Sequence, residues 1–194
     1  MIINIDRTCG SKGEKVAEFV AEKLGLQLID DEYIMNKAKE LGKYDELLKY
    51  FTNPASDVLL SLDLDLEGEE HGEFLNQVLQ LMPEDNFVAV GICANHLYRN
   101  KGALSIFLTS YLKDQIKAVM EEVDGLEDED DAKDYIRQLN GRRRLLHEAF
   151  TCEPWGDPSK YDICLNVSTC GVEQCAEGII FAANFKFKGI TIGQ

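Results

Sequence analysis

Short apolar runs and longer amphipathic stretches alternate along the whole chain. The runs at residues 1–6, 86–92 and 104–109 are short and mainly apolar, which is typical of strands buried on both faces. Between them, apolar residues recur three or four positions apart, which predicts helices. This alternation of strand and helix indicates an α/β fold with a mostly parallel sheet flanked by helices.

The remaining segments extend this pattern. Two more short strands are predicted at 26–29 and 162–167. Residues 43–85 are harder to interpret: the alternation of Leu with Asp or Ser predicts a strand at 58–68, flanked by helical patterns at 44–51 and 69–82. Elsewhere helical patterns cover residues 16–24, 30–41, 94–99, 112–123, 136–150 and 172–183, with Gly25 and Gly42 as stops of the first two.

Length and charge limit the possible functions. The 194 residues suit one domain, and the formal net charge of −15 argues against binding to nucleic-acid polymers, which requires a clustered basic face. A small phosphorylated ligand needs only a local group of donors. The acidic stretch 121–134 is interpreted as a solvated helix face and loop, and three adjacent arginines follow it at 142–144.

Targeting and metal signals are also informative. No apolar run approaches the ~20 residues of a membrane span, and the N-terminus lacks the basic flank of a signal peptide, so we expect a cytoplasmic protein with reduced thiols. The six cysteines form no CxxC pair and have no histidine at ligand spacing, so no structural metal site is predicted.

The first predicted strand leads through a glycine-containing turn, DRTCGSKGEK (6–15), into a helix. Such a turn lets backbone N–H groups point at a phosphate, and the helix N-terminus adds partial positive charge. A P-loop reads GxxxxGK[ST], yet here Gly13 falls at the lysine and Glu14 at the hydroxyl residue, where its carboxylate would repel phosphate. Lys12 and Lys15 are the cations that could replace that lysine. An ordinary surface turn before a helix stays open at this point.

Residues 5–34 resemble the opening of the cytidylate kinase-like family. Members typically begin with a strand, a Ser-Arg pair, a Phe-Gly-Ser-Gly-Gly-type loop and a helix ending in Ala-Glu-Lys-Leu-Gly. Here Asp6 replaces the usual serine and Lys12 a usual glycine. The residues that match the loop are Arg7, Gly10, Ser11 and Gly13.

Two later stretches strengthen the resemblance. FVAVGICANHLYRN (87–100) is similar to the family's Val-Ile-Val-Gly-Arg-Cys-Ala segment, with Gly91 in register and Ile92 at the usual arginine. RRRLLHEAFTCEPWGDPSKYDICLNVS (142–168) is similar to a stretch that contains Trp-Gly-Asp-Pro-x-x-Tyr-Asp and Asn-Thr-Ser. Trp155 is interpreted as a packing anchor or as a platform for a base. The residues in register are Trp155, Gly156, Asp157, Pro158, Tyr161, Asp162, Asn166 and Ser168.

The resemblance implies a P-loop kinase core formed by one domain over 1–194. Residues 43–85 would form a helical insertion that binds a nucleoside monophosphate, and 124–150 a mobile lid. The lid would carry Arg142, Arg143 and Arg144, whose guanidinium groups match phosphate oxygens. Successive helical positions diverge by about 100°, so these three side chains cannot all face one ligand. Pairing of the arginines with the acidic run stays open.

Other residues are assigned by the same resemblance. Asp30, Asp31 and Gly91 would lie beside the acceptor, although either aspartate could simply cap the next helix. Asp162 and Asn166 flank the last strand and could orient a nucleotide base or order the turn.

The resemblance implies a phosphotransferase that uses ATP and Mg²⁺ to phosphorylate a small acceptor such as a nucleoside monophosphate. Lys12 or Lys15 and the lid arginines would act in catalysis, while Arg7 and the loop 10–13 would bind the nucleotide. The departures at Gly13, Glu14 and Ile92 lead us to expect slow or absent transfer to ordinary nucleoside monophosphates. The alternative is a nucleotide-binding protein of the same fold with little or no phosphotransferase activity. The sequence leaves the acceptor and the oligomeric state open.

Overall fold

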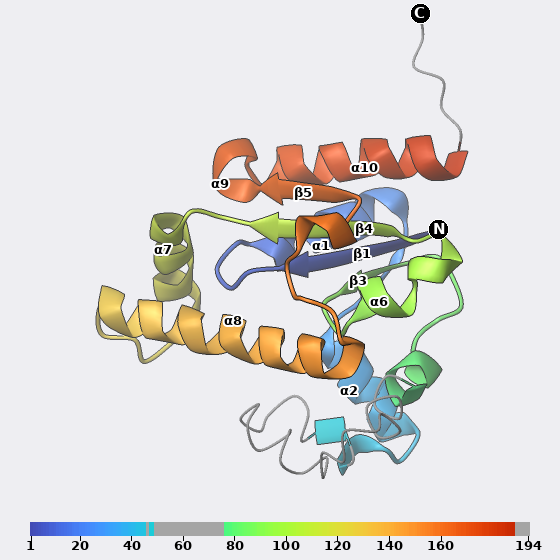
Figure 1. The fold of residues 1–194 in the computed structure, drawn as a ribbon, viewed down its shortest axis with the longest axis horizontal. Coiled ribbons are helices and arrows are strands. Elements are labelled where there is room, and N and C mark those ends of the chain that lie inside the picture. The colour runs from blue at the N-terminus through green and yellow to red at the C-terminus, as the bar shows by residue number, and fades with distance from the viewer. Residues whose placement is uncertain (46, 49–75, 189–194) are drawn as a thin grey trace, which may run out of the picture.

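A computed structural model describes residues 1–45, 47–48 and 76–188. In this part of the chain one sheet is built from parallel strands in the order β2-β3-β1-β4-β5 (Figure 1). Residues Ile2 and Ile5 of β1 pair with Phe87 and Val90 of β3, so the predicted parallel pairing of these two strands is confirmed. The strands are β1 Ile2–Arg7, β2 Gln27–Ile29, β3 Phe87–Val90, β4 Leu104–Thr109 and β5 Ile163–Asn166.

Helices cover both faces of this sheet, which confirms the predicted fold class. They are α1 Gly13–Leu24, α2 Asp31–Glu40, α6 Ala94–Leu97, α7 Leu112–Glu122, α8 Glu129–Thr151, α9 Val167–Cys170 and α10 Val172–Lys188, with 3₁₀ turns η1 Arg99–Lys101 and η2 Pro158–Lys160. The strands alternate their side chains between two cores. Ile3 and Ile5 pack with α1 and α10 on one face, whereas Ile2 packs with α2 and α6 on the other.

The helices α7 and α8 form a layer of their own beside the carboxyl ends of the strands (Figure 1). Their contact is apolar and includes Ile116, Val119, Ala132 and Ile136, together with Cys9 from the turn after β1. The acidic run begins α8: Asp128 caps it by accepting hydrogen bonds from the backbone N–H groups of Asp130 and Asp131. The helix then continues unbroken to Thr151 and carries all three arginines. A lid role for 124–150 stays a prediction.

Several expectations fall partly outside the described residues. The predicted strand at 58–68 lies there entirely, and so does most of the 43–85 insertion. Residues 76–81 are helical, within the helix expected over 69–82. Among the described helices, none combines the length and the apolar character needed to cross a bilayer.

Candidate functional site

The turn between β1 and α1 is tightly folded. Gly10 has φ 69°, and a Cβ there would lie 2.6 Å from the carbonyl oxygen of Gln115 in α7, so only glycine fits. Ser11 is fully buried, and its hydroxyl donates to the carbonyl of Thr8 at 2.7 Å. Lys12 adopts φ 59° immediately before α1, and its side chain does not cap the helix. The helix N-terminus adds partial positive charge here, but the backbone N–H of Glu14 donates to the carboxylate of Glu14 itself, so this end of α1 is partly capped by an acid.

Two neighbouring helices hold this turn in place. Asn140 of α8 accepts a hydrogen bond from the backbone N–H of Cys9 at 2.8 Å. Gln115 of α7 donates to the hydroxyl of Thr8 at 3.1 Å. These contacts fix the turn against α7 and α8.

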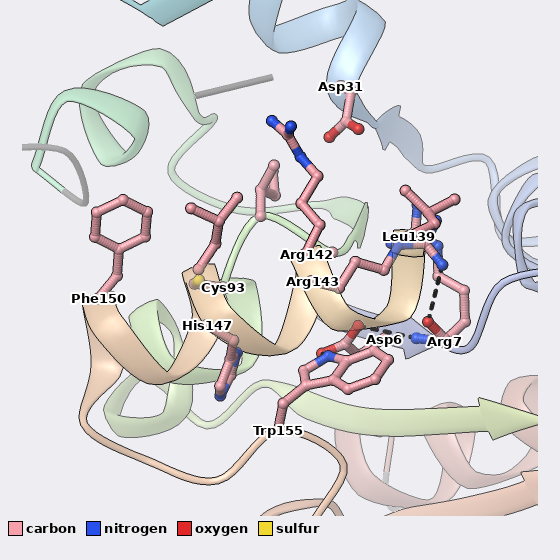
Figure 2. A pocket seen from close by; sticks show the side chains of 13 residues that line it. Asp6, Arg7, Asp31, Cys93, Leu139, Arg142, Arg143, His147, Phe150 and Trp155 are labelled. Atoms are coloured by element: carbon pink, nitrogen blue, oxygen red, sulfur yellow. Dashed lines mark hydrogen bonds between the residues drawn. The ribbon is translucent and has the colours of Figure 1, made fainter. Parts of the chain in front are cut away.

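A cavity of about 160 Å³ opens beside the turn, at the carboxyl ends of β1 and β3 (Figure 2). It lies where parallel α/β sheets usually bind their ligands. The arginine-bearing face of α8 forms one wall, and the segment after β3 forms another. The lining residues are Asp6, Arg7, Asp31, Gly91, Ile92, Cys93, Leu139, Arg142, Arg143, Leu146, His147, Phe150 and Trp155.

Glu14 pairs with two of the arginines at this cavity. Its Oε1 lies 2.8 Å from Nε of Arg7 and 3.5 Å from Nη2 of Arg143. Arg143 also donates from Nη1 to the backbone oxygen of Arg7 at 3.2 Å. Burial disfavours the charged carboxylate of Glu14, but the attraction of Arg7 and then Arg143 outweighs it and lowers the pKa. An ionised carboxylate thus partly neutralises the cations that a phosphate would use.

The two aspartates after β2 have different roles. Asp30 caps α2, accepting a hydrogen bond from the N–H of Tyr33 at 2.8 Å. Asp31 instead lines the cavity, and Figure 2 shows its carboxylate and the guanidinium of Arg142 pointing into the same space. Burial raises the pKa of Asp31, although Arg7 and Arg143 oppose this shift.

Asp6 is held by three donors. Its Oδ2 accepts hydrogen bonds from Nε1 of Trp155 at 2.9 Å and from the hydroxyl of Tyr161 at 3.0 Å, and its Oδ1 accepts from the N–H of Arg7 at 2.9 Å. Both aromatic rings also pack on Phe107, with centroids 5.6 Å and 5.1 Å away. Trp155 is therefore a packing anchor whose ring also lines the cavity.

The segment after β3 adopts an unusual backbone. Gly91, Ile92 and Cys93 have φ values of 70°, 49° and 55° in succession. A Cβ at Gly91 would lie 2.6 Å from Nη1 of Arg7, so glycine at this position lets the guanidinium approach the backbone. Left-handed φ is rare for a β-branched residue, and strain of this kind concentrates at functional sites.

A second space lies on the other side of the turn. This cavity of about 280 Å³ is lined by Gly10 and Lys12 and by residues at the start of α7, in α9 and at the start of α10. Asn166 caps α9 by accepting from the N–H of Ser168 at 3.0 Å, so it orders the turn beside this space. The remaining lining residues are Ser110, Asp114, Lys117, Ala118, Val167, Ser168, Gly171 and Val172.

Three expected site residues lie away from these cavities. Lys15 points outward and pairs with Glu122 of α7. Arg144 is exposed and does not line the cleft. Asp162 lies at the opposite end of the sheet, where its Oδ2 accepts from the N–H of Ser105 at 2.9 Å. The arrangement thus brings Arg7, Arg142, Arg143 and Asp31 together around one cleft.

The family model that matches this chain is the one described as the cytidylate kinase-like family, and it covers residues 2–169. The chain belongs to this family. No curated protein sequence matches it significantly.

Solved structures with the same fold support the kinase architecture. An uncharacterized protein from Eubacterium ventriosum is 25% identical, with a TM-score of 0.70 over 95% of this chain and 98% of the other. A shikimate kinase from Bacteroides thetaiotaomicron is 13% identical, with a TM-score of 0.56 over 95% and 98%. A shikimate kinase from Acinetobacter baumannii, solved with shikimate, is 13% identical, with a TM-score of 0.51 over 93% and 91%. At the identities of the two kinases, the likeness concerns the fold alone.

Some residues of this family member's site were not assigned by sequence reasoning. In the sequence Asp6 appeared only as a replacement for a serine. Its hydrogen bonds come from Trp155 and Tyr161, which lie about 150 positions further along the chain. His147 was given no role from the sequence, yet it is buried at the cleft, and burial lowers its pKa. Its place four positions after Arg143, on the same helical face, was the available signal.

Proposed function

We propose that this protein is a cytoplasmic kinase that transfers the γ-phosphoryl group of ATP, bound with Mg²⁺, to a small acceptor such as a nucleoside monophosphate. The observation that carries the proposal is the convergence of Arg7, Arg142 and Arg143 on one cavity beside the glycine turn. Phosphoryl transfer is catalysed mainly by positioning and by neutralising charge on the phosphate oxygens, which is the chemistry that arginines supply.

The nucleotide phosphates would lie at the turn, where the N-terminus of α1 adds partial positive charge and Lys12 lines the neighbouring space. The space of about 280 Å³ beyond Lys12 is then the side for the nucleoside. Lys15 is the weaker candidate for a compensating cation, since it is engaged by Glu122.

Mg²⁺ takes oxygen ligands, chiefly carboxylates, phosphates and water. Of the two aspartates that line the cleft, Asp6 already accepts hydrogen bonds on both oxygens. Asp31 is therefore the residue that would hold the ion. When bound, Mg²⁺ offsets the negative charge of the phosphates; the arginines and the backbone of the turn orient them.

The alternative, a nucleotide-binding protein with little transfer activity, is favoured by two observations. Glu14 holds its carboxylate against Arg7 and Arg143, and Ile92 places an apolar side chain in the same cleft. Losing one well-placed charge in a phosphate site costs about 3–4 kcal/mol of transition-state stabilisation, or a factor of 10²–10³ in rate. We therefore expect slow transfer.

The two functions are separated by measuring binding and turnover on the same protein. Trp155 is the sole tryptophan of the chain and lines the cleft, so its fluorescence reports nucleotide binding. ADP release is followed at saturating MgATP with CMP, UMP, AMP and dCMP. Release that requires an acceptor supports the kinase, whereas saturable binding without ADP release supports the alternative. A rate near the usual ~10 s⁻¹ would contradict our interpretation of Glu14.

A further inference from the structure

One polar side chain of the cleft has no partner within the part of the chain that the structure describes. His147 lies in the second half of α8 and lines the cleft, although the residue is only 4% exposed. Its backbone carbonyl accepts a hydrogen bond from the hydroxyl of Thr151 at 2.7 Å, but among the described residues neither ring nitrogen makes a hydrogen bond. Neither nitrogen is sealed inside the protein. Because buried polar side chains nearly always find a partner, this imidazole is available to a ligand of the cleft.

The polar groups beside His147 are already engaged. Figure 2 shows the imidazole on the side of the cleft that holds Trp155, whereas the guanidinium of Arg142 points the opposite way, toward Asp31. Asp6 accepts three hydrogen bonds, and one of them uses the indole N–H of Trp155. Among the described residues, His147 therefore supplies the free hydrogen-bonding nitrogens on this side of the cleft.

The charges around the ring indicate what kind of group it can bind. Burial, the largest influence, lowers the pKa of His147, so at pH 7 the imidazole is neutral and offers one donor and one acceptor. The titratable groups that act on it are Asp6, Glu153, His96 and Glu148, in that order. Three of these four are acidic, so this side of the cleft disfavours a phosphate. An uncharged hydroxyl, or the polar edge of a base, suits a neutral imidazole.

We propose that His147 determines acceptor specificity by forming a hydrogen bond with an uncharged polar group of the acceptor, while the cleft arginines hold its phosphate. The acceptor class is then a phosphate monoester that carries a hydroxyl or a polar base edge, and an apolar phosphate ester fits poorly. This inference rests on the proposed function, because it takes the cleft to be the acceptor site. A hydroxyl and a base edge share the same hydrogen-bonding chemistry, and the choice of ligands separates them.

Calorimetric titration of the full chain with three phosphate monoesters tests this role. CMP carries hydroxyls and a base, ribose 5-phosphate carries hydroxyls alone, and phenyl phosphate carries neither. His147→Leu should weaken CMP binding about threefold to tenfold, which corresponds to one hydrogen bond between uncharged groups, and leave phenyl phosphate unaffected. A matching loss for ribose 5-phosphate identifies a hydroxyl as the partner, and a loss for CMP alone identifies the base edge.

Two further variants show whether the hydrogen bond is responsible. His147→Gln keeps a neutral donor and acceptor and should recover part of the CMP affinity that His147→Leu loses. His96→Gln replaces a histidine of α6 that does not line the cleft, and it should leave all three affinities unchanged.

The contrary results separate this inference from the proposed function. If His147→Leu leaves CMP binding unchanged, or weakens CMP and phenyl phosphate equally, the imidazole holds only a water or the fold, and the inference is wrong while the proposed function stands. Arg143→Ala should weaken all three ligands. No effect of that variant, or no binding of any ligand to the wild type, would overturn both. Should His147→Leu not fold, His147→Phe also removes both nitrogens. Wild-type protein that binds phenyl phosphate as tightly as CMP would overturn the inference without any variant.

Discussion

Replacing Glu14 by glutamine should increase the affinity of the cleft for phosphate. Glu14 lies 2.8 Å from Arg7, whose side chain is only 9% exposed, so the carboxylate and a phosphate compete for a guanidinium that has little contact with water. An anion on another edge of that guanidinium would lie about 4–6 Å from the carboxylate. The substitution keeps the shape of the side chain and removes its charge.

The magnitude follows from the distance and the exposure. Two like charges about 4 Å apart near a protein surface repel by roughly 4 kcal/mol at an effective dielectric constant of 20. The side chain of Glu14 is 51% exposed, and solvent and salt screen such a pair, so about 1–2 kcal/mol is the realistic gain. Glu14→Gln should therefore bind ADP about tenfold more tightly. The gain should shrink at high salt.

ADP without Mg²⁺ is the suitable ligand, because a metal ion would mask the repulsion. The affinity is read from Trp155 fluorescence, with Glu18→Gln as the control, since Glu18 is exposed on the outer side of the same helix. The unliganded Glu14→Gln protein should also lose about 1 kcal/mol of unfolding free energy, because the charged hydrogen bond between Glu14 and Arg7 becomes a neutral one. A folded variant whose ADP affinity is unchanged or weaker would refute the competition between Glu14 and phosphate.

Three further predictions test other parts of the site. Arg143→Ala should weaken ADP binding about tenfold or more, whereas Arg144→Ala, at the exposed neighbouring position, should not. Equal effects in the same fluorescence titration would show that the cleft-facing side of α8 has no special role in binding. Gly10→Ala should destabilise the fold by about 1–3 kcal/mol more than Gly25→Ala in urea unfolding, because both positions have positive φ but only Gly10 faces a backbone oxygen at 2.6 Å; similar losses would show that the turn can move. Glu153→Gln should lower stability by about 1–2 kcal/mol at pH 7. The hydrogen bond from Arg99, opposed by burial, lowers the pKa of Glu153 from 4.5 to about 2. The stability difference between wild type and variant should therefore be full above pH 4.5 and vanish as the pH falls toward 2. A stability difference that stays constant with pH would contradict this.

Much of the fold was accessible from the sequence because it depends on local pattern. β3 is a continuous apolar run, and β1 begins with an apolar stretch interrupted only by Asn4 before Asp6, so both were recognisable as strands buried on both faces. The α1 helix ends at Gly25, in the left-handed conformation that glycine tolerates best. The family also follows from local matches, since the turn after β1 and the segment around Trp155 are contiguous stretches. The strands, the end of α1 and the family all depend on contiguous residues and not on distant contacts.

The charge balance of the cleft depended on tertiary structure. The sequence indicated that Glu14 would oppose phosphate, but its pairing with Arg143 joins residues 129 positions apart. Asp30 and Asp31 are adjacent and chemically identical, yet one caps a helix and the other faces Arg142, because successive residues at a helix start point in different directions. The same divergence separates Arg143 from Arg144.

Asp162 and Asn166 illustrate the same distinction for a strand. Both flank β5, and by sequence either could order a turn or contact a nucleotide base. Because the sheet is parallel, the carboxyl ends of its strands meet at the turn between β1 and α1, and Asn166 lies there while Asp162 lies at the opposite end, beside Ser105 and Lys186. Within the described residues, sequence alone determined the five strands of the sheet and the family to which the chain belongs. Only the folded arrangement decided which charges meet, because Coulomb interactions act through space between residues that the chain order keeps apart.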